Sequence, residues 1–433
     1  MLRKHLILLA TFAGLVILLP VLAQLAGGGN TAIEKALEEK QYKKADSLLQ
    51  KELARFYASG QLDTIATYVR QTGTIAYELY GADKATTTVF SFIDTLAARK
   101  AVPKTLVKAC REAAEFFAGN GQNSEGYRSC ERAMNYALQL TERKEPEIAQ
   151  CEYNLGVYAQ RLGNYSLSQS HHRRSLTMRE KNPGTTAEDL YFSCNAMGAI
   201  YWYASKLDSA ALLFTRALEN VKKMTDNPLN RLYRPAMIHN NLAALYSAEG
   251  KTSEGIRSME LTISHFQQFI ATKDPHPKKK DAEVGLLEAI DNLAGLYKEV
   301  GDYGKAGELL RYAYQEKIKR LNTGNPGIFI SEILMGQHFN SIHEYDSALI
   351  YLNSGLDKLE KTEGDYLIWA GDANYNLAMV YANRKETDKA AYYYERAEAS
   401  YDSSLQGEYD NVYMDFLRSA AIFYAENNQY EKA

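Results

Sequence analysis

The sequence predicts an all-α fold, an α-solenoid of stacked antiparallel helix pairs, and two observations support it. A small residue in the middle of an expected helix recurs every 42–51 residues: Ala114, Gly156, Gly198, Ala243, Ala294, Gly336, Ala378 and Ala421. A second small residue follows each of these in an expected partner helix: Gly126, Ser168, Ala210, Gly255, Ala306, Ala348, Ala390 and Ala433. One helix pair of this size cannot bury its apolar face alone, so each pair must stack on a neighbour.

The clearest copy of the repeat spans residues 376–397 and fits two short helices. Ala378 and Ala390 have such small side chains that the two helices can approach closely. Tyr381 and Tyr394 fill the space beside them, which explains much of the high tyrosine content, 32 residues, by packing. The helices in four copies are separated by a glycine, for which a turn with positive φ is easiest: Gly121, Gly163, Gly250 and Gly301.

The first segment of the chain has the features of an export signal. Residues 3–5 are basic, and an apolar run over residues 6–22 follows, interrupted by Pro20. Small residues before Gln24 provide a cleavage point, so residues 1–23 are expected to be a signal peptide. The protein is then exported, to the periplasm or the extracellular space. The alternative is a membrane anchor formed by residues 6–22, although that run is short for a membrane span.

The rest of the chain divides into two parts. Residues 24–105 are expected to form an irregular helical N-terminal cap or degenerate repeats. Residues 106–433 are expected to form the array, with about seven full repeats and one truncated repeat. The 51-residue interval contains an insertion in which residues 278–280, three lysines, are expected in a solvated loop. The last copy stops at Ala433, where its second helix begins, so we expect the N-terminal part of a longer protein.

Charge and cysteine content narrow the function classes. The chain has 50 basic and 53 acidic residues and a net charge of −3, which argues against a nucleic-acid binder. The four cysteines are Cys110, Cys130, Cys151 and Cys194, and none has the spacing of a metal or redox motif. They are expected to be small core residues; pairing in an oxidising compartment is the alternative.

The recurring pattern resembles the tetratricopeptide repeat, over about three quarters of the chain. Several offsets recur together in eight copies, but each copy is about eight residues longer than the usual 34. Such long repeats are similar to those of the kinesin-light-chain subtype. An Asn-Leu-Ala sequence in three copies and the loop at residues 274–277, Asp-Pro-His-Pro, favour the same subtype.

The resemblance implies a peptide-binding groove along the first helix of each pair. In the family, an asparagine just before the small residue bonds to the backbone of a bound extended peptide. The matching residues here are Asn154, Asn241, Asn292 and Asn376. Neighbouring positions are expected to add contacts: Asn195, Asn240, Arg161, Trp202 and Lys298. The alternative for the asparagines is a hydrogen bond between helices that fixes the repeat geometry. Three copies have Ala196, Leu334 or Ser419 instead, which interrupts any continuous track.

No motif in the chain predicts catalysis, a metal site or a cofactor site. The adjacent His171 and His172 point in different directions on a helix, so they make a poor metal pair. We therefore expect a non-catalytic scaffold that binds a protein or an extended peptide, with membrane contact only through an uncleaved signal or a later segment. The alternative is the sensor or adaptor region of a longer enzyme. Long-repeat arrays with a signal peptide resemble the N-terminal regions of bacterial proteins that end in a CHAT-type peptidase domain or a membrane histidine kinase.

Overall fold

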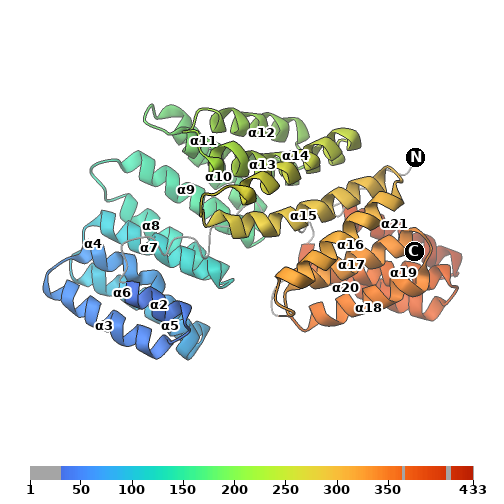
Figure 1. Cartoon of the computed structure of the whole chain (residues 1–433), viewed down its shortest axis with the longest axis horizontal. Coiled ribbons are helices and arrows are strands. Elements are labelled where there is room, and N and C mark those ends of the chain that lie inside the picture. Colours follow the sequence, from blue (N-terminus) through green and yellow to red (C-terminus); the bar gives the residue numbers. More distant parts are fainter. Residues whose placement is uncertain (1–30, 363–365, 406–410, 433) are drawn as a thin grey trace. The chain divides into compact units, whose positions relative to one another are not determined.

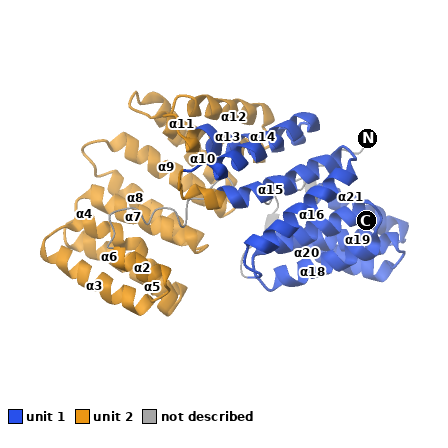
Figure 2. Cartoon of the chain, in the orientation of Figure 1, with its two compact units in different colours: residues 1–15, 231–273, 282–433 blue, residues 16–230, 274–281 orange. Residues whose placement is uncertain are grey.

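The computed structural model describes residues 31–362, 366–405 and 411–432. The predicted signal peptide, the alternative anchor and Ala433 lie outside these residues. The chain forms two compact units, which Figure 2 shows in blue and orange. Of the described residues, unit 1 contains 231–273, 282–362, 366–405 and 411–432, and unit 2 contains 31–230 and 274–281. Each unit is built from helices (Figure 1).

Unit 2 begins with two helix pairs in the segment expected to be irregular. They are formed by α2 (Thr31–Glu38), α3 (Tyr42–Ala58), α4 (Leu62–Ile65), the 3₁₀ turn η1 (Ala66–Tyr68), α5 (Val69–Tyr80) and α6 (Ala82–Ala98). The following pairs are α7 (Pro103–Gly119) with α8 (Asn123–Ala137), α9 (Lys144–Arg161) with α10 (Tyr165–Lys181), and α11 (Ala187–Tyr203) with α12 (Leu207–Val221). Proline occupies the first turn of α7, where its missing N–H is tolerated. The array helix therefore begins three residues before the predicted start at residue 106.

Unit 1 continues the same arrangement after a π-helical turn, η2 (Leu229–Tyr233). Its helices are α13 (Arg234–Ala248), α14 (Thr252–Ala271), α15 (Lys278–Glu299, in unit 1 from residue 282), α16 (Tyr303–Arg320), α17 (Pro326–Ser341), α18 (Tyr345–Glu360), α19 (Leu367–Asn383), α20 (Thr387–Leu405) and α21 (Asn411–Glu426). The all-α fold of stacked helix pairs is confirmed.

The three lysines at 278–280 correct one expectation. They form the first turn of α15 instead of a solvated loop. The Lys278 ammonium pairs with the Asp281 carboxylate at 2.7 Å, one helical turn away. Pro277 precedes the helix, and an ion pair at this spacing supports the first turn. The loop before α15 is therefore shorter than the sequence suggested.

The small residues perform the packing role predicted from their spacing. A Cβ added to Gly198 would lie 2.7 Å from the Phe214 ring, and one added to Gly336 would lie 2.5 Å from Leu352 Cγ. Both distances are too short for a real contact, so the close approach of the two helices requires glycine. The buried rings and aliphatic side chains of the second helices fill the space that these glycines leave.

Every turn between paired helices from α7 onward places one residue in the left-handed region. The four predicted glycines have φ between +70° and +81°. The equivalent residues of the other copies also have positive φ without being glycine: Ser205, His343, Lys385 and Asn428. A non-glycine residue there costs roughly 1 kcal/mol, so the stacking of the helices imposes this turn geometry.

Candidate binding surface and pocket

The nine predicted groove residues all lie on first helices and are divided between the units. In unit 2 they are Asn154 and Arg161 on α9, and Asn195 and Trp202 on α11. In unit 1 they are Asn240 and Asn241 on α13, Asn292 and Lys298 on α15, and Asn376 on α19. Each unit therefore presents its own set of polar residues on its first helices.

Burial separates these nine residues into two classes. Asn195, Asn240, Asn241 and Asn292 are buried, with at most 6% of their surface exposed. The other five are half-buried. The two half-buried residues of unit 2 that are not asparagine lie against tyrosines. The Arg161 guanidinium lies 5.5 Å from the centre of the Tyr158 ring, and the Trp202 ring packs edge-on against Tyr203.

Asn376 makes the hydrogen bond that the structural alternative predicted. Its Oδ1 accepts from the Asn340 amide of α17 at 3.2 Å, and its own amide donates to the Asp372 carbonyl at 2.9 Å. Asn340 is not among the predicted residues, because the asparagine position of its repeat is Leu334. Asn154 differs, since its Oδ1 accepts from Gln150 of the same helix at 2.8 Å.

Three buried amides on first helices form no hydrogen bond with any residue that the structure describes. Gln160 on α9, Asn240 on α13 and Gln337 on α17 are at most 6% exposed, yet neither the amide nitrogen nor the oxygen of any of them bonds to a described residue. Most buried polar groups have a protein or water partner. The donors and acceptors of these amides therefore remain for water or for a ligand.

A buried cation joins neighbouring repeats in each unit. In unit 2, Arg179 of α10 donates to Ser193 Oγ at 2.7 Å and to the Asp189 carbonyl at 2.9 Å, both on α11. It also donates to Gln150 Oε1 of α9 at 2.6 Å. Its guanidinium lies 5.2 Å from the centre of the Tyr153 ring, and burial lowers the pKa of Arg179. The arginine thereby connects three helices.

Lys317 of α16 forms the equivalent contact in unit 1. Its ammonium donates to Ser331 Oγ at 2.9 Å and to the Gly327 carbonyl at 3.3 Å, both on α17. Its third donor bonds to Asp291 Oδ2 of α15 at 2.5 Å. Lys317 and Asp291 are each 4% exposed at the side chain, so this ion pair is fully buried. We refer to the contacts of Arg179 and of Lys317 as the two cation clamps.

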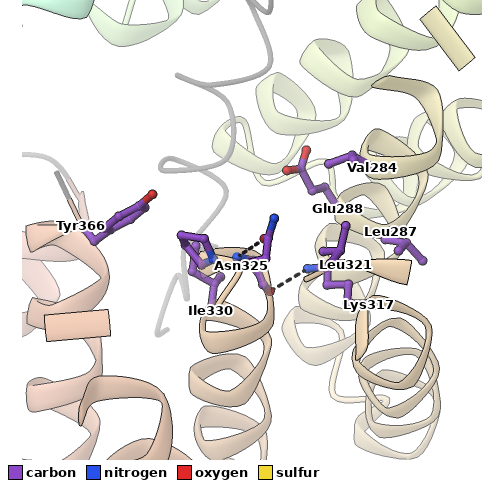
Figure 3. Close-up of a pocket in the computed structure, with 10 residues that line it drawn as sticks. Val284, Leu287, Glu288, Lys317, Leu321, Asn325, Ile330 and Tyr366 are labelled. Atoms are coloured by element: carbon purple, nitrogen blue, oxygen red, sulfur yellow. Dashed lines mark hydrogen bonds between the residues drawn. The ribbon is translucent and has the colours of Figure 1, made fainter. Parts of the chain in front are cut away.

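A pocket of about 240 Å³ lies beside the Lys317 clamp. Its wall includes Val284, Leu287 and Glu288 of α15, the N-terminal turn of α17, and Tyr366 immediately before α19. Figure 3 shows Glu288 and Tyr366 on facing sides of this pocket. Glu288 forms no hydrogen bond or ion pair with a described residue. Burial raises the pKa of Glu288 to about 7, Lys317 acts in the opposite direction, and Asp291 adds to the rise.

The histidines examined in the sequence have structural roles. His172 is fully buried and packs over Gly156, at the position where other repeats place Phe214 and Leu352. Burial lowers the pKa of His172 to about 3, so its ring is neutral at physiological pH. His171 Nδ1 contacts Glu152 Oε2 at 2.6 Å. The residues that the structure describes contain no cluster of three metal-ligand side chains.

The four cysteines are buried and free, as the core interpretation expected. Burial raises the pKa of Cys110 and Cys151 to about 12 and that of Cys194 to about 11. Such thiols are unreactive at neutral pH. Over the described parts of the chain, no helix combines the length and the apolar character that a bilayer crossing requires.

Stacked helix pairs with polar residues along their first helices define a helical repeat scaffold. Residues 147–223 match the family model of the tetratricopeptide repeat, and they cover most of α9 to α12. This segment of the chain thus has the tetratricopeptide repeat that the spacing of the small residues predicted. No curated protein sequence matches it.

Solved structures agree with this fold at low sequence identity. The apo form of the quorum sensor NprR from B. thuringiensis is 13% identical, over 85% of this chain and 96% of its own, with a TM-score of 0.58. A Rap protein complexed with competence and sporulation factor is 14% identical, over 87% of this chain and 94% of its own, with a TM-score of 0.55. Aspartyl phosphate phosphatase F from Bacillus subtilis is 12% identical, over 86% of this chain and 90% of its own, with a TM-score of 0.52. The similarity shows a shared fold.

Proposed function

We propose that this chain is a non-catalytic scaffold that binds a protein or an extended peptide along its first helices. The observation that carries the proposal is the set of buried amides, Gln160, Asn240 and Gln337, which have no partner among the described residues. An amide side chain both donates and accepts. An extended peptide exposes alternating N–H and C=O groups, which are chemically complementary to an amide side chain.

The structural neighbours support a binding role by analogy. The Rap structure holds competence and sporulation factor, and NprR is described as a quorum sensor. Because identity is 13–14%, these descriptions set an expectation for this chain and no more. Phosphatase F has the same fold and a catalytic name, so fold alone does not decide between binding and catalysis.

A peptide-display experiment tests the scaffold proposal. Peptides selected from a random library on the wild-type chain should bind the Gln337→Leu variant at least about tenfold more weakly, because the leucine cannot hydrogen-bond. Removing an unpartnered buried amide leaves no polar group unmet, so the variant should keep its melting temperature. Asn353→Leu, on the exposed face of a second helix, is the matched control and should bind normally. A library that yields no binder would contradict the proposal.

The predicted asparagines provide a second, independent comparison. Asn241→Ala combined with Asn292→Ala should weaken binding of the selected peptide with little change in melting temperature. Unchanged affinity with a large loss of stability would instead assign both side chains to the repeat geometry.

We also propose that residues 1–23 direct export, on the basis of their basic start and apolar run. Mass spectrometry of the exported protein should find Gln24 as its first residue. An intact Met1 in the membrane fraction would support the anchor formed by residues 6–22.

A further inference from the structure

We propose that the pocket between α15, α17 and Tyr366 holds one basic side chain, lysine or arginine, of a bound peptide, with Glu288 as its charge partner. The inference rests on the proposed scaffold function, because it names a residue type that the bound peptide supplies. It gives unit 1 a site that selects one side chain of the peptide, whereas the predicted asparagines would contact only the peptide backbone.

The charges around the pocket favour a cation over an anion. The Lys317 ammonium has three donors, and Asp291, Ser331 and Gly327 use all three. It therefore has none left for an anionic ligand. Glu288 is the charged group of the wall that no described residue pairs with. When Glu288 is ionised, the group formed with Lys317 and Asp291 carries a net charge of −1.

The remainder of the wall fits the stem of a basic side chain. Val284, Leu287 and Ile330 are aliphatic, and they line the same pocket as the carboxylate. A volume of about 240 Å³ is below the range of about 300–1,000 Å³ typical of small-molecule sites, so it suits one side chain. Lysine and arginine combine an apolar stem with a charged tip, and they commonly lay the stem along apolar surface.

Tyr366 provides a second polar group in the pocket wall. Its ring lies across the pocket from the Glu288 carboxylate in Figure 3. The hydroxyl forms no hydrogen bond with a described residue, so its oxygen is available to accept one from the cation. The charged end of a lysine or arginine can therefore bond to the Glu288 carboxylate on one side of the pocket and to the Tyr366 hydroxyl on the other.

The raised pKa of Glu288 agrees with this arrangement. Burial disfavours the ionised carboxylate more than Lys317 favours it, and a bound cation would add a second favourable charge beside it. The bonds formed would be charge-assisted, which are stronger than bonds between neutral groups.

The test uses blocked tripeptides, acetyl-Gly-X-Gly-amide, with X as lysine, norleucine or glutamate. Ligand-observed NMR titration measures their affinity for the full chain. We expect the lysine peptide to bind at least about tenfold more tightly than the other two. Glu288→Gln should remove this preference, and Glu308→Gln, an exposed carboxylate on α16, should leave it intact. The glutamine has nearly the same shape and carries no buried charge, so the variant should fold.

Three results would overturn the pocket assignment: equal binding of the norleucine peptide, tighter binding of the glutamate peptide, or no binding of the lysine peptide. A lysine preference that survives in Glu288→Gln would do the same. These results differ from failure of the scaffold proposal. A library-selected peptide that binds wild type and Glu288→Gln equally, and Gln337→Leu weakly, would retain the scaffold and reject the pocket.

Discussion

The two cation clamps make equivalent contacts with the next repeat, but the groups that accompany the positive charge within their own repeat differ. Arg179 and Lys317 each bond to a serine hydroxyl 14 residues later and to a carbonyl 10 residues later, on the first helix of the next repeat. On their own first helix the partners differ. Arg179 uses the neutral Gln150 and the face of Tyr153, whereas Lys317 uses the buried Asp291.

This difference explains why Glu288 forms no hydrogen bond with a described residue, whereas Gln150 bonds to Arg179. Gln150 and Glu288 occupy the same position of the repeat, six residues before Gly156 and Ala294. In unit 2 the residue at that position, Gln150, accepts a hydrogen bond from Arg179. In unit 1, Asp291 neutralises the lysine from one turn further along α15, so Glu288 is left facing the pocket. The repeat position that bonds to the clamp in unit 2 is therefore the one to which our proposal assigns ligand binding in unit 1.

The largest expected effect distinguishes the two clamps directly. Lys317→Met leaves Asp291 buried without its cation, which should lower the free energy of unfolding by about 4 kcal/mol. Chemical denaturation followed by circular dichroism measures this loss. Lys319→Met is the control, because Lys319 is 66% exposed at the side chain and its pairing with Glu316 should contribute less than about 1 kcal/mol. Equal losses in the two variants would show that the buried pair is not an important stabilising contact.

Arg179→Met should cost less, about 2–3 kcal/mol. The variant loses hydrogen bonds to Ser193, Gln150 and the Asp189 carbonyl, but it leaves no charge buried, because the Asp189 carboxylate is 37% exposed at the side chain. The same denaturation experiment provides the comparison, with the exposed Arg173→Met as control. If Arg179→Met lowered the free energy of unfolding as much as Lys317→Met does, the neutral partners of Arg179 would not make its loss less costly than that of Lys317.

Glu288→Gln should change how stability depends on pH. Burial raises the pKa of Glu288 from 4.5 to about 7, so between these values the folded chain keeps a proton that the unfolded chain has released. Stability of the wild type should therefore fall as pH rises through this window. Above about pH 7 the variant should be more stable by roughly 1–2 kcal/mol, because solvent screening reduces the full effect of such a shift. Below about pH 4.5 the two should be alike.

Thermal unfolding at several pH values measures this difference, with Glu308→Gln as the control that should follow the wild type. A wild type and a Glu288→Gln variant with parallel pH profiles would show that the carboxylate is not desolvated in the folded chain. Glu288 would then differ from Gln150 only in lacking a hydrogen-bond partner among the described residues, and no longer in being a desolvated acid.

The fold could be predicted from the sequence because packing repeats. Small residues such as Gly198 and Gly336 are required wherever two helices touch, so they recur at a fixed interval that is visible without a structure. The turn residues were only half recognised. Ser205 and His343 have positive φ because the stacked helices impose it, and neither residue type signals that conformation.

The polar contacts were harder to predict, because they depend on which side chains meet in space. Arg179 and Lys317 look like ordinary surface residues of a helix. One signal was available, since the equivalent positions of other repeats are apolar, as at Val221 and Leu359. Glu288 had no such signal. Glu288 has no hydrogen-bond partner among the described residues because Lys317 bonds to Asp291 instead, a contact that depends on how the helices pack.

The smallest expected effect concerns Asn376, and it sharpens the contrast between asparagines that hold the repeats and those available to a ligand. The Asn340–Asn376 hydrogen bond joins two first helices, whereas Asn154 bonds within its own helix. A double-mutant cycle of Asn340→Ala and Asn376→Ala should give a coupling free energy of about 0.5–1 kcal/mol. The cycle cancels the separate loss of the bond from Asn376 to the Asp372 carbonyl. A matched cycle of Asn340→Ala with Asn353→Ala should show no coupling. If the first cycle also gave none, Asn376 would not bind the repeats together, and its amide would join those of Asn240 and Gln337 as a group available to a bound peptide.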